Sequence, residues 1–158
     1  MKKEIKSIEI SEGNRMSVIR IFPHSRKEFR SADELASWLQ SGLRDRDGKY
    51  RLRNVGAGIG STPLGSVVLF RFDKEIIGEA IVKQDVIEEE IVDSGYTYKG
   101  YIQFEQSSVR VYRGFLPIEF LEKASGRDLS VARPYYKIDD WGVYAKVIKE
   151  QVKRGGFL

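Results

Sequence analysis

The segment from Ser66 to Val82 is the strongest constraint on the fold. Two runs of mainly apolar and β-branched residues, Ser66–Phe72 and Ile76–Val82, are separated by the polar residues 73–75. Two such runs with a short polar connection are typical of a β-hairpin. We therefore expect the core to be built on antiparallel strands.

Other segments predict further strands and helices around this hairpin. Residues 16–22 are rich in β-branched and aromatic types and stop at Pro23, which predicts a strand followed by a turn. Ser31 and Glu34 form a capping-box pattern, which predicts that a helix starts there. The Gly- and Pro-containing residues 49–65 predict a loop. The other predicted elements are strands near 85–92, 96–104 and 109–112, a short helix from Pro117 to about Gly126, and an amphipathic terminal helix after Asp140.

These elements predict an α+β domain with a curled, mostly antiparallel β-barrel of roughly five to six strands flanked by helices. We expect residues 1–158 to form a single domain. Residues 1–15 would be an edge strand or a flexible arm, and residues 154–158 a tail or the start of a linker. Trp38 and Trp141 lie on the apolar faces of their helices, so we expect both in the core.

Composition excludes several kinds of chemistry. The chain has no cysteine, and His24 is its one histidine. Disulfides, thiolate catalysis and Cys/His zinc sites are therefore excluded, and we expect no metal or other cofactor. His24 sits beside a proline in a basic loop, where we expect it to be exposed or to contact a ligand. Because no catalytic constellation can be assembled, we do not expect an enzyme.

Two segments resemble phosphate-binding motifs but lack features that these motifs require. In Gly56–Ser61 the glycine spacing departs from the dinucleotide-binding pattern, and Pro63 stands where the phosphate-binding helix should run. Gly60–Ser66 lacks the lysine of a Walker loop. The sequence also contains no apolar run long enough for a membrane helix or a signal peptide, so we expect no membrane contact and a cytoplasmic location.

The positive feature is a mixture of basic and aromatic residues. The net charge of +4 and the pI near 9.2 favour a partner that carries phosphates. Arginine and lysine can neutralise phosphates while aromatic faces stack on exposed bases. The candidate nucleic-acid-binding residues are Ser25, Arg26, Lys27, Arg51, Arg53, Asn54, Arg113 and Arg133, and the candidate base-stacking or pocket residues are Tyr50, Tyr112, Tyr135 and Tyr136.

The order of elements over residues 16–92 resembles the EVE and YTH branch of the PUA-like superfamily. The resemblance is carried by a strand, a polar loop, a capped helix, a Gly/Ser/Thr/Pro loop, and then a hairpin with the strand Ile77-Gly78-Glu79-Ala80-Ile81-Val82. It implies a β-barrel that grips nucleic acid or flips a base, often a methylated one, into an aromatic pocket. By position, the family's first-strand loop falls on His24–Lys27 and its pocket-wall loop on Tyr50–Thr62.

On this resemblance, the expected function is a modified-base reader, such as the DNA-recognition part of a modification-dependent restriction system. DNA is the expected partner rather than RNA, together with a C-terminal effector domain or a partner subunit. Tyr50 and either Tyr135 or Tyr136 would sandwich the base, and Asn54 or Ser25 would hydrogen-bond its edge. Two alternatives stay open: an ASCH-like ribonuclease, and a non-catalytic domain that binds a protein or a small ligand.

Overall fold

The structure is a computed structural model that describes residues 16–56, 62–133 and 136–158. The predicted strand or arm at residues 1–15 lies outside the described residues. The strands are β1 (Ile19–His24), β2 (Lys49–Leu52), β3 (Val67–Phe72), β4 (Glu75–Asp93), β5 (Tyr96–Phe104), β6 (Arg110–Pro117) and β7 (Lys137–Ile138). The helical segments are α2 (Ala32–Ser37), the π-helical η1 (Trp38–Gly42), α3 (Leu43–Asp45), the 3-10 turn η3 (Gln106–Ser108), α4 (Ile118–Ser125) and α5 (Trp141–Lys153).

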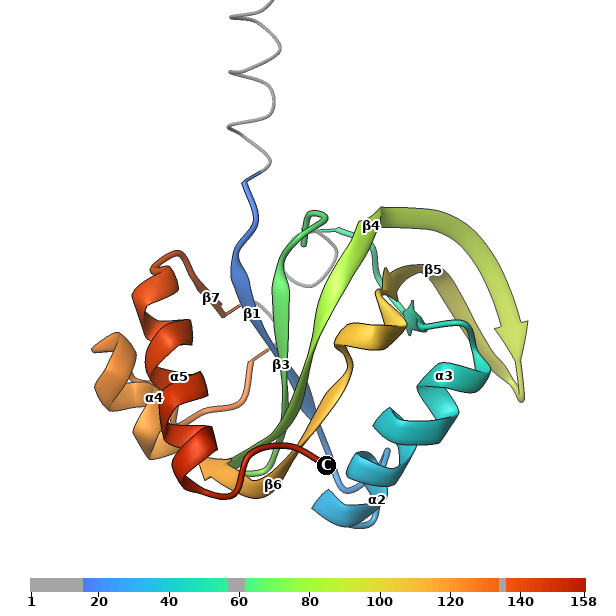
Figure 1. The fold of residues 1–158 in the computed structure, drawn as a ribbon. Helices are drawn as coiled ribbons and strands as arrows, with labels where there is room; N and C mark the ends of the chain where they lie inside the picture. The colour runs from blue at the N-terminus through green and yellow to red at the C-terminus, as the bar shows by residue number, and fades with distance from the viewer. Residues whose placement is uncertain (1–15, 57–61, 134–135) are drawn as a thin grey trace, which may run out of the picture.

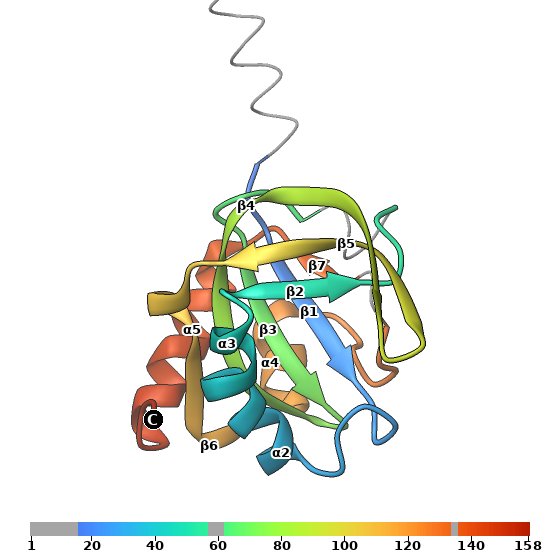
Figure 2. The ribbon, with the colours of Figure 1, turned by 90° about the vertical axis from the view of Figure 1, so that its right-hand side faces the viewer.

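In the part of the chain that the structure describes, seven strands form a curled, mixed sheet (Figures 1 and 2). The strand order is β2-β5-β4-β3-β1-β7, and β6 also pairs with β4. β1 and β3 are parallel, and the other pairs are antiparallel. The predicted α+β class is confirmed, but the sheet is not closed into a barrel. Between the described residues of β2 and those of β1 and β7 there is no strand pairing.

The long strand β4 is what curls the sheet. Its first part pairs with β3 and β6, and its second part pairs with β5. We predicted two strands, 76–82 and 85–92, but the chain stays extended through Lys83-Gln84-Asp85 because this stretch contains no turn-forming glycine or proline. Register shifts between Val82 and Gln84 and between Gln84 and Ile87 bend the strand instead.

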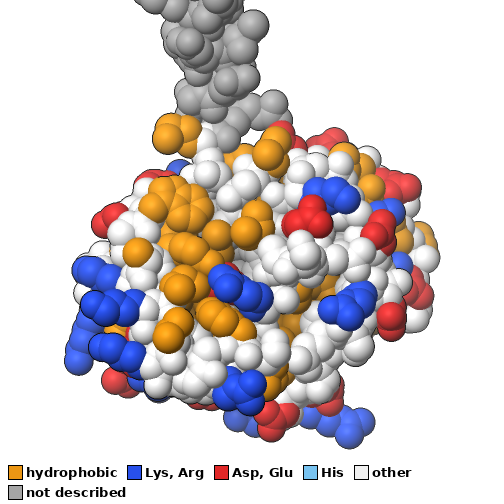
Figure 3. Space-filling model, in the orientation of Figure 1, with side chains coloured by type: hydrophobic (Ala, Val, Ile, Leu, Met, Phe, Trp, Pro, Cys, Tyr) orange, Lys and Arg blue, Asp and Glu red, His pale blue; other side chains and the backbone are white. Residues whose placement is uncertain are grey.

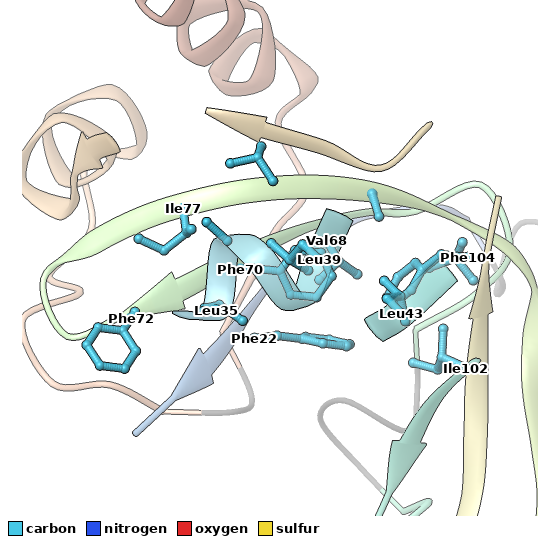
Figure 4. Close-up of a cluster of buried hydrophobic side chains, with 14 of the residues drawn as sticks. Phe22, Leu35, Leu39, Leu43, Val68, Phe70, Phe72, Ile77, Ile102 and Phe104 are labelled. Atoms are coloured by element: carbon cyan, nitrogen blue, oxygen red, sulfur yellow. The ribbon is translucent and has the colours of Figure 1, made fainter. Parts of the chain in front are cut away.

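Apolar side chains fill both faces of the central strands. On one face, Phe22, Val68 and Phe70 pack with the helical segment α2–η1–α3 and with β5 (Figure 4). On the other face, Ile21 and Leu69 pack with α4 and α5. The strands β1 and β3 therefore lie between two layers of helix, as Figure 1 shows. Among the described residues, no helix has the length and apolar composition needed to cross a membrane.

The predictions for the helix cap and for the two tryptophans are confirmed in part. Ser31 caps α2, because its Oγ accepts a hydrogen bond from the backbone N of Glu34 at 3.2 Å. Trp38 is half-buried against the core, as predicted. The prediction for Trp141 is wrong: this side chain is 39% exposed, because it stands at the first residue of α5, where it flanks the buried face of the helix.

The C-terminal residues, predicted as a tail or the start of a linker, are docked on β6. The N–H of Leu158 donates to the carbonyl of Val111 at 2.9 Å, and the N–H of Arg113 donates to Gly156 at 3.0 Å. The Arg113 guanidinium also donates to the carbonyls of Gly155 and Phe157. This segment therefore extends the sheet along the outer edge of β6.

Gly78 lies where β4 crosses closest to β6. A Cβ atom at this position would be 2.5 Å from the carbonyl oxygen of Arg110 and 3.2 Å from Leu39 Cδ1. The nearer atom belongs to the backbone of a paired strand and cannot move aside without breaking that pairing. The glycine is therefore required by the close approach of the strands.

We predict that Gly78→Ala lowers the free energy of unfolding by about 1 to 3 kcal/mol, the usual cost of forcing extra volume into a packed site. Urea denaturation followed by circular dichroism measures this loss. Gly56→Ala is the matched control, because a Cβ at Gly56 meets no atom within 4 Å. Equal stability of the two variants would contradict the interpretation.

Candidate functional site

His24 and Tyr50 link β1 to β2 across the open side of the sheet. His24 is only 6% exposed; its Nε2 lies 2.7 Å from the Tyr50 hydroxyl and its Nδ1 lies 3.2 Å from the Arg71 carbonyl oxygen. Since a carbonyl can only accept, Nδ1 carries the proton and Nε2 accepts from Tyr50. The expectation of an exposed or ligand-contacting His24 is therefore wrong: the side chain joins two strands that share no backbone pairing.

The ring of Tyr50 packs against aromatic side chains of the core. Its centroid lies 5.2 Å from that of Phe22, 6.1 Å from those of Trp38 and Phe104, and 6.2 Å from that of Phe70. Burial raises the pKa of the hydroxyl above its usual value. The prediction that Tyr50 sandwiches a base conflicts with this packing, because the half-buried ring already contacts four aromatic rings of the core.

Cations of β2 and of the turn after it lie over tyrosine rings of β5. Alternate residues of β2 and of the turn that follows it supply the cations, and β5, the partner strand of β2, supplies the tyrosines. We call this series the cation–tyrosine ladder. Its pairs are Lys49 Nζ over Tyr101 at 5.0 Å, Arg51 Cζ over Tyr98 at 5.7 Å and Arg53 Cζ over Tyr96 at 4.7 Å from the ring centroids.

The pairs of the ladder differ in their accessibility to a ligand. Arg51 is held by Asp93, whose Oδ2 lies 2.6 Å from Arg51 Nη1. Hydrogen bonds from Arg51 and Ser94 lower the pKa of the Asp93 carboxyl. Arg53 is exposed and Tyr96 is 51% exposed. The outer pair, Arg53 and Tyr96, is therefore the more accessible end.

The loop after β1 contains three further predicted residues. Ser25, Arg26 and Lys27 directly follow His24 and are exposed. Arg26 lies 3.8 Å from Asp73 and 6.0 Å from the centre of the Phe72 ring. Figure 2 shows that the ends of β1 and β2 point to the same side of the molecule as the turn of the β4–β5 hairpin. The exposed Asn54 follows β2 on that side.

The remaining predicted residues do not join this region. The prediction for Tyr112 is wrong: it is fully buried, and its hydroxyl donates to Glu79 at 2.9 Å, so it has no free face for a base. Arg113 holds the C-terminal segment on the edge of β6. Arg133 is exposed in the segment before β7. Tyr136 packs against the core beside α4 and α5 with Arg127 5.5 Å from its ring centre, and Tyr135 lies outside the described residues.

Sequence analysis missed the tyrosines of the ladder. Tyr96, Tyr98 and Tyr101 fall within the strand that we predicted at 96–104, and cations alternate at 49, 51 and 53. Residues 49–52 were assigned to a loop, so nothing placed these cations next to β5. The usable signal was the alternation itself, which is the period of a strand.

The described residues contain no cluster of His, Cys, Asp or Glu that could hold a metal ion. A comparison with models of known protein families and with curated proteins found no match. The function must therefore be argued from the geometry of the site.

We predict that His24 makes the stability of the fold depend on pH. Burial lowers its pKa below the usual 6.5, so below that pH the unfolded chain binds a proton that the folded chain resists. Stability is thus fully present above about pH 6.5 and falls as the pH drops towards the folded-state pKa. Between about pH 7.5 and about pH 5 the wild type should lose about 1 to 2 kcal/mol more than His24→Gln.

Urea denaturation of both proteins at the two pH values measures this difference. Because the chain has one histidine, the difference between the two losses reports on His24 itself. Parallel losses in wild type and variant would show that His24 titrates equally in the folded and unfolded states.

Proposed function

We propose that this chain is a nucleic-acid-binding domain that holds a strand along the cation–tyrosine ladder. The ladder itself is the supporting observation. Guanidinium and ammonium groups can bind phosphates, and tyrosine faces can stack on bases. A protein that tracks a nucleic-acid strand needs both kinds of group along one line.

The charges around the ladder favour one path for the strand. On the neighbouring arm of β4, Glu88, Glu89 and Glu90 are exposed and would repel phosphates. An anionic strand therefore follows β2 and β5 and keeps away from the free edge of β4. Stacking requires a base whose face is open, so the proposed ligand is single-stranded, or a duplex with a base flipped out.

Recognition of a modified base is the finer part of this proposal. It rests on the resemblance to EVE and YTH domains, with DNA as the preferred nucleic acid. Ser25, in the loop after β1, and Asn54, directly after β2, are exposed polar side chains that can hydrogen-bond a base edge. A role as the DNA-recognition part of a restriction system follows from the same resemblance.

Fluorescence anisotropy tests the proposal with plain oligonucleotides and with ones that carry N6-methyladenine or 5-methylcytosine, single- and double-stranded, at two salt concentrations. We predict that Tyr96→Ala weakens binding by about 1 to 3 kcal/mol, because a stacking face is lost. Arg53→Ala should weaken binding to every sequence and reduce the salt slope by about 1.

Lys153→Ala is the matched control, since Lys153 is an exposed cation on α5, far along the chain from the ladder. It should bind as the wild type does. Tyr96→Ala and Arg53→Ala variants with unchanged affinity would reject the ladder as the binding surface. Equal affinity for modified and plain oligonucleotides would reject the modified-base part alone, and cleavage of the oligonucleotides would favour a nuclease.

A further inference from the structure

The apolar side of the helix α5 is wider than the part of it that packs on the sheet. Val143, Val147 and Gln151 are buried against the sheet. The apolar side chains at 141, 144, 148 and 152 continue the sector onto one flank of the helix, where Trp141 and Val152 are exposed. Figure 3 shows hydrophobic side chains gathered around α5 and the strands next to it.

This flank continues without a break onto the sheet. The ring of Trp141 meets that of Tyr144 at 6.1 Å, and the Tyr144 hydroxyl lies 3.2 Å from Arg110 Nη2. The Arg110 guanidinium in turn lies 4.2 Å from the ring centre of Phe157. We call Trp141, Tyr144, Arg110 and Phe157 the α5 strip.

Beyond Phe157, the strip leads to a groove. Leu158 is exposed and lines a cavity of about 240 Å³ together with Leu39, Leu43, Val109 and Val111. The polar side chains Gln40, Arg44 and Gln106 also line this cavity. An extended or helical segment that lay on the strip could thus place one apolar side chain into the groove.

A buried ionic network holds the middle of the α5 strip, Tyr144 and Arg110, in place. Glu79 is 1% exposed and accepts hydrogen bonds from the hydroxyls of Tyr112 and Tyr144 and from Arg110 Nη2 at 2.9 Å. A buried carboxylate must keep such partners, so Tyr144 and Arg110 stay in place, and Trp141 and Phe157 pack on them. Preformed surfaces of Trp, Tyr and Arg are the kind that dominate binding energy at protein interfaces.

The charges near the strip decide which partner fits it. Lys146, Lys149 and Lys153 are exposed along the outer side of α5, next to the apolar flank. The carboxylates of α5 and its cap are engaged: Asp140 caps the N–H of Gly142, and Glu150 binds Arg154 at 2.9 Å. Asp139 stands at the end of the strip, before the cap. The flank is therefore positive along most of its length.

We propose that the α5 strip is a docking site for a partner protein that presents an acidic segment with apolar anchors. The apolar anchors would cover Trp141 and Phe157, and the acidic side chains would face the three lysines. A second copy of this chain is a poorer occupant, because a two-fold interface would bring the lysine rows and Arg110 together. The proposal does not depend on nucleic-acid binding at the ladder.

Selection of short peptides from a phage-displayed library on the full chain tests this proposal. We expect enriched peptides to combine Asp or Glu with Trp, Phe or Leu, and to bind Trp141→Asp about tenfold more weakly or worse than wild type. Aspartate suits the first residue of a helix, so this variant should stay folded, which a thermal melt verifies. Lys149→Glu should also weaken binding and reduce its dependence on salt.

Val92→Asp is the matched control: Val92 is 71% exposed and lies on the β4–β5 hairpin, so the peptides should bind this variant as they bind wild type. Arg53→Ala should likewise leave peptide binding unchanged, which separates this site from the ladder. Peptides without acidic residues, peptides indifferent to Trp141→Asp, or failure to enrich any peptide would overturn the proposal. A dimer of the wild type that Trp141→Asp dissociates would overturn it in favour of a second copy.

Discussion

A curled sheet that does not close must seal its open side with side chains. Here the seal is the hydrogen bond from Tyr50 to His24, set in a cluster that includes Phe22, Phe70 and Phe104. In a closed barrel, hydrogen bonds between strands would satisfy the backbone N–H and C=O groups along the whole edge. Here one side-chain hydrogen bond inside an aromatic core joins the two strands. Pairing with β5 holds one edge of β2, and this contact ties the strand to β1 on the other side.

The same seal explains why the His24 ring is buried and why both of its nitrogens are already engaged. A hydroxyl that is buried with its ring keeps a hydrogen-bond partner, and the imidazole supplies an acceptor without introducing a charge. The neutral form of His24 is thus part of the packing. The more accessible cation is Arg53, which directly follows β2 and lies over Tyr96 of β5.

Sequence patterns predicted the elements whose signals are local. The hairpin β3–β4, the Ser31 cap, the strand from Tyr96 to Phe104 and the end of α4 at Gly126 follow from neighbouring residues. Burial of Tyr112 follows from its contact with Glu79, and β2 exists because β5 offers it an edge; both depend on residues far apart in the sequence. Of the predicted cations, Arg51 and Arg53 lie over tyrosines of β5 that the sequence analysis did not single out.

The strand β4 connects the two surfaces proposed as binding sites. Its first part carries Glu79, which fixes Arg110 and Tyr144 beneath the α5 strip. Its second part pairs with β5, which carries the tyrosines of the ladder. The register shifts that bend β4 therefore set the direction of the ladder relative to the α5 strip. The proposed nucleic-acid site and the proposed protein site then share one strand, each on a different part of it.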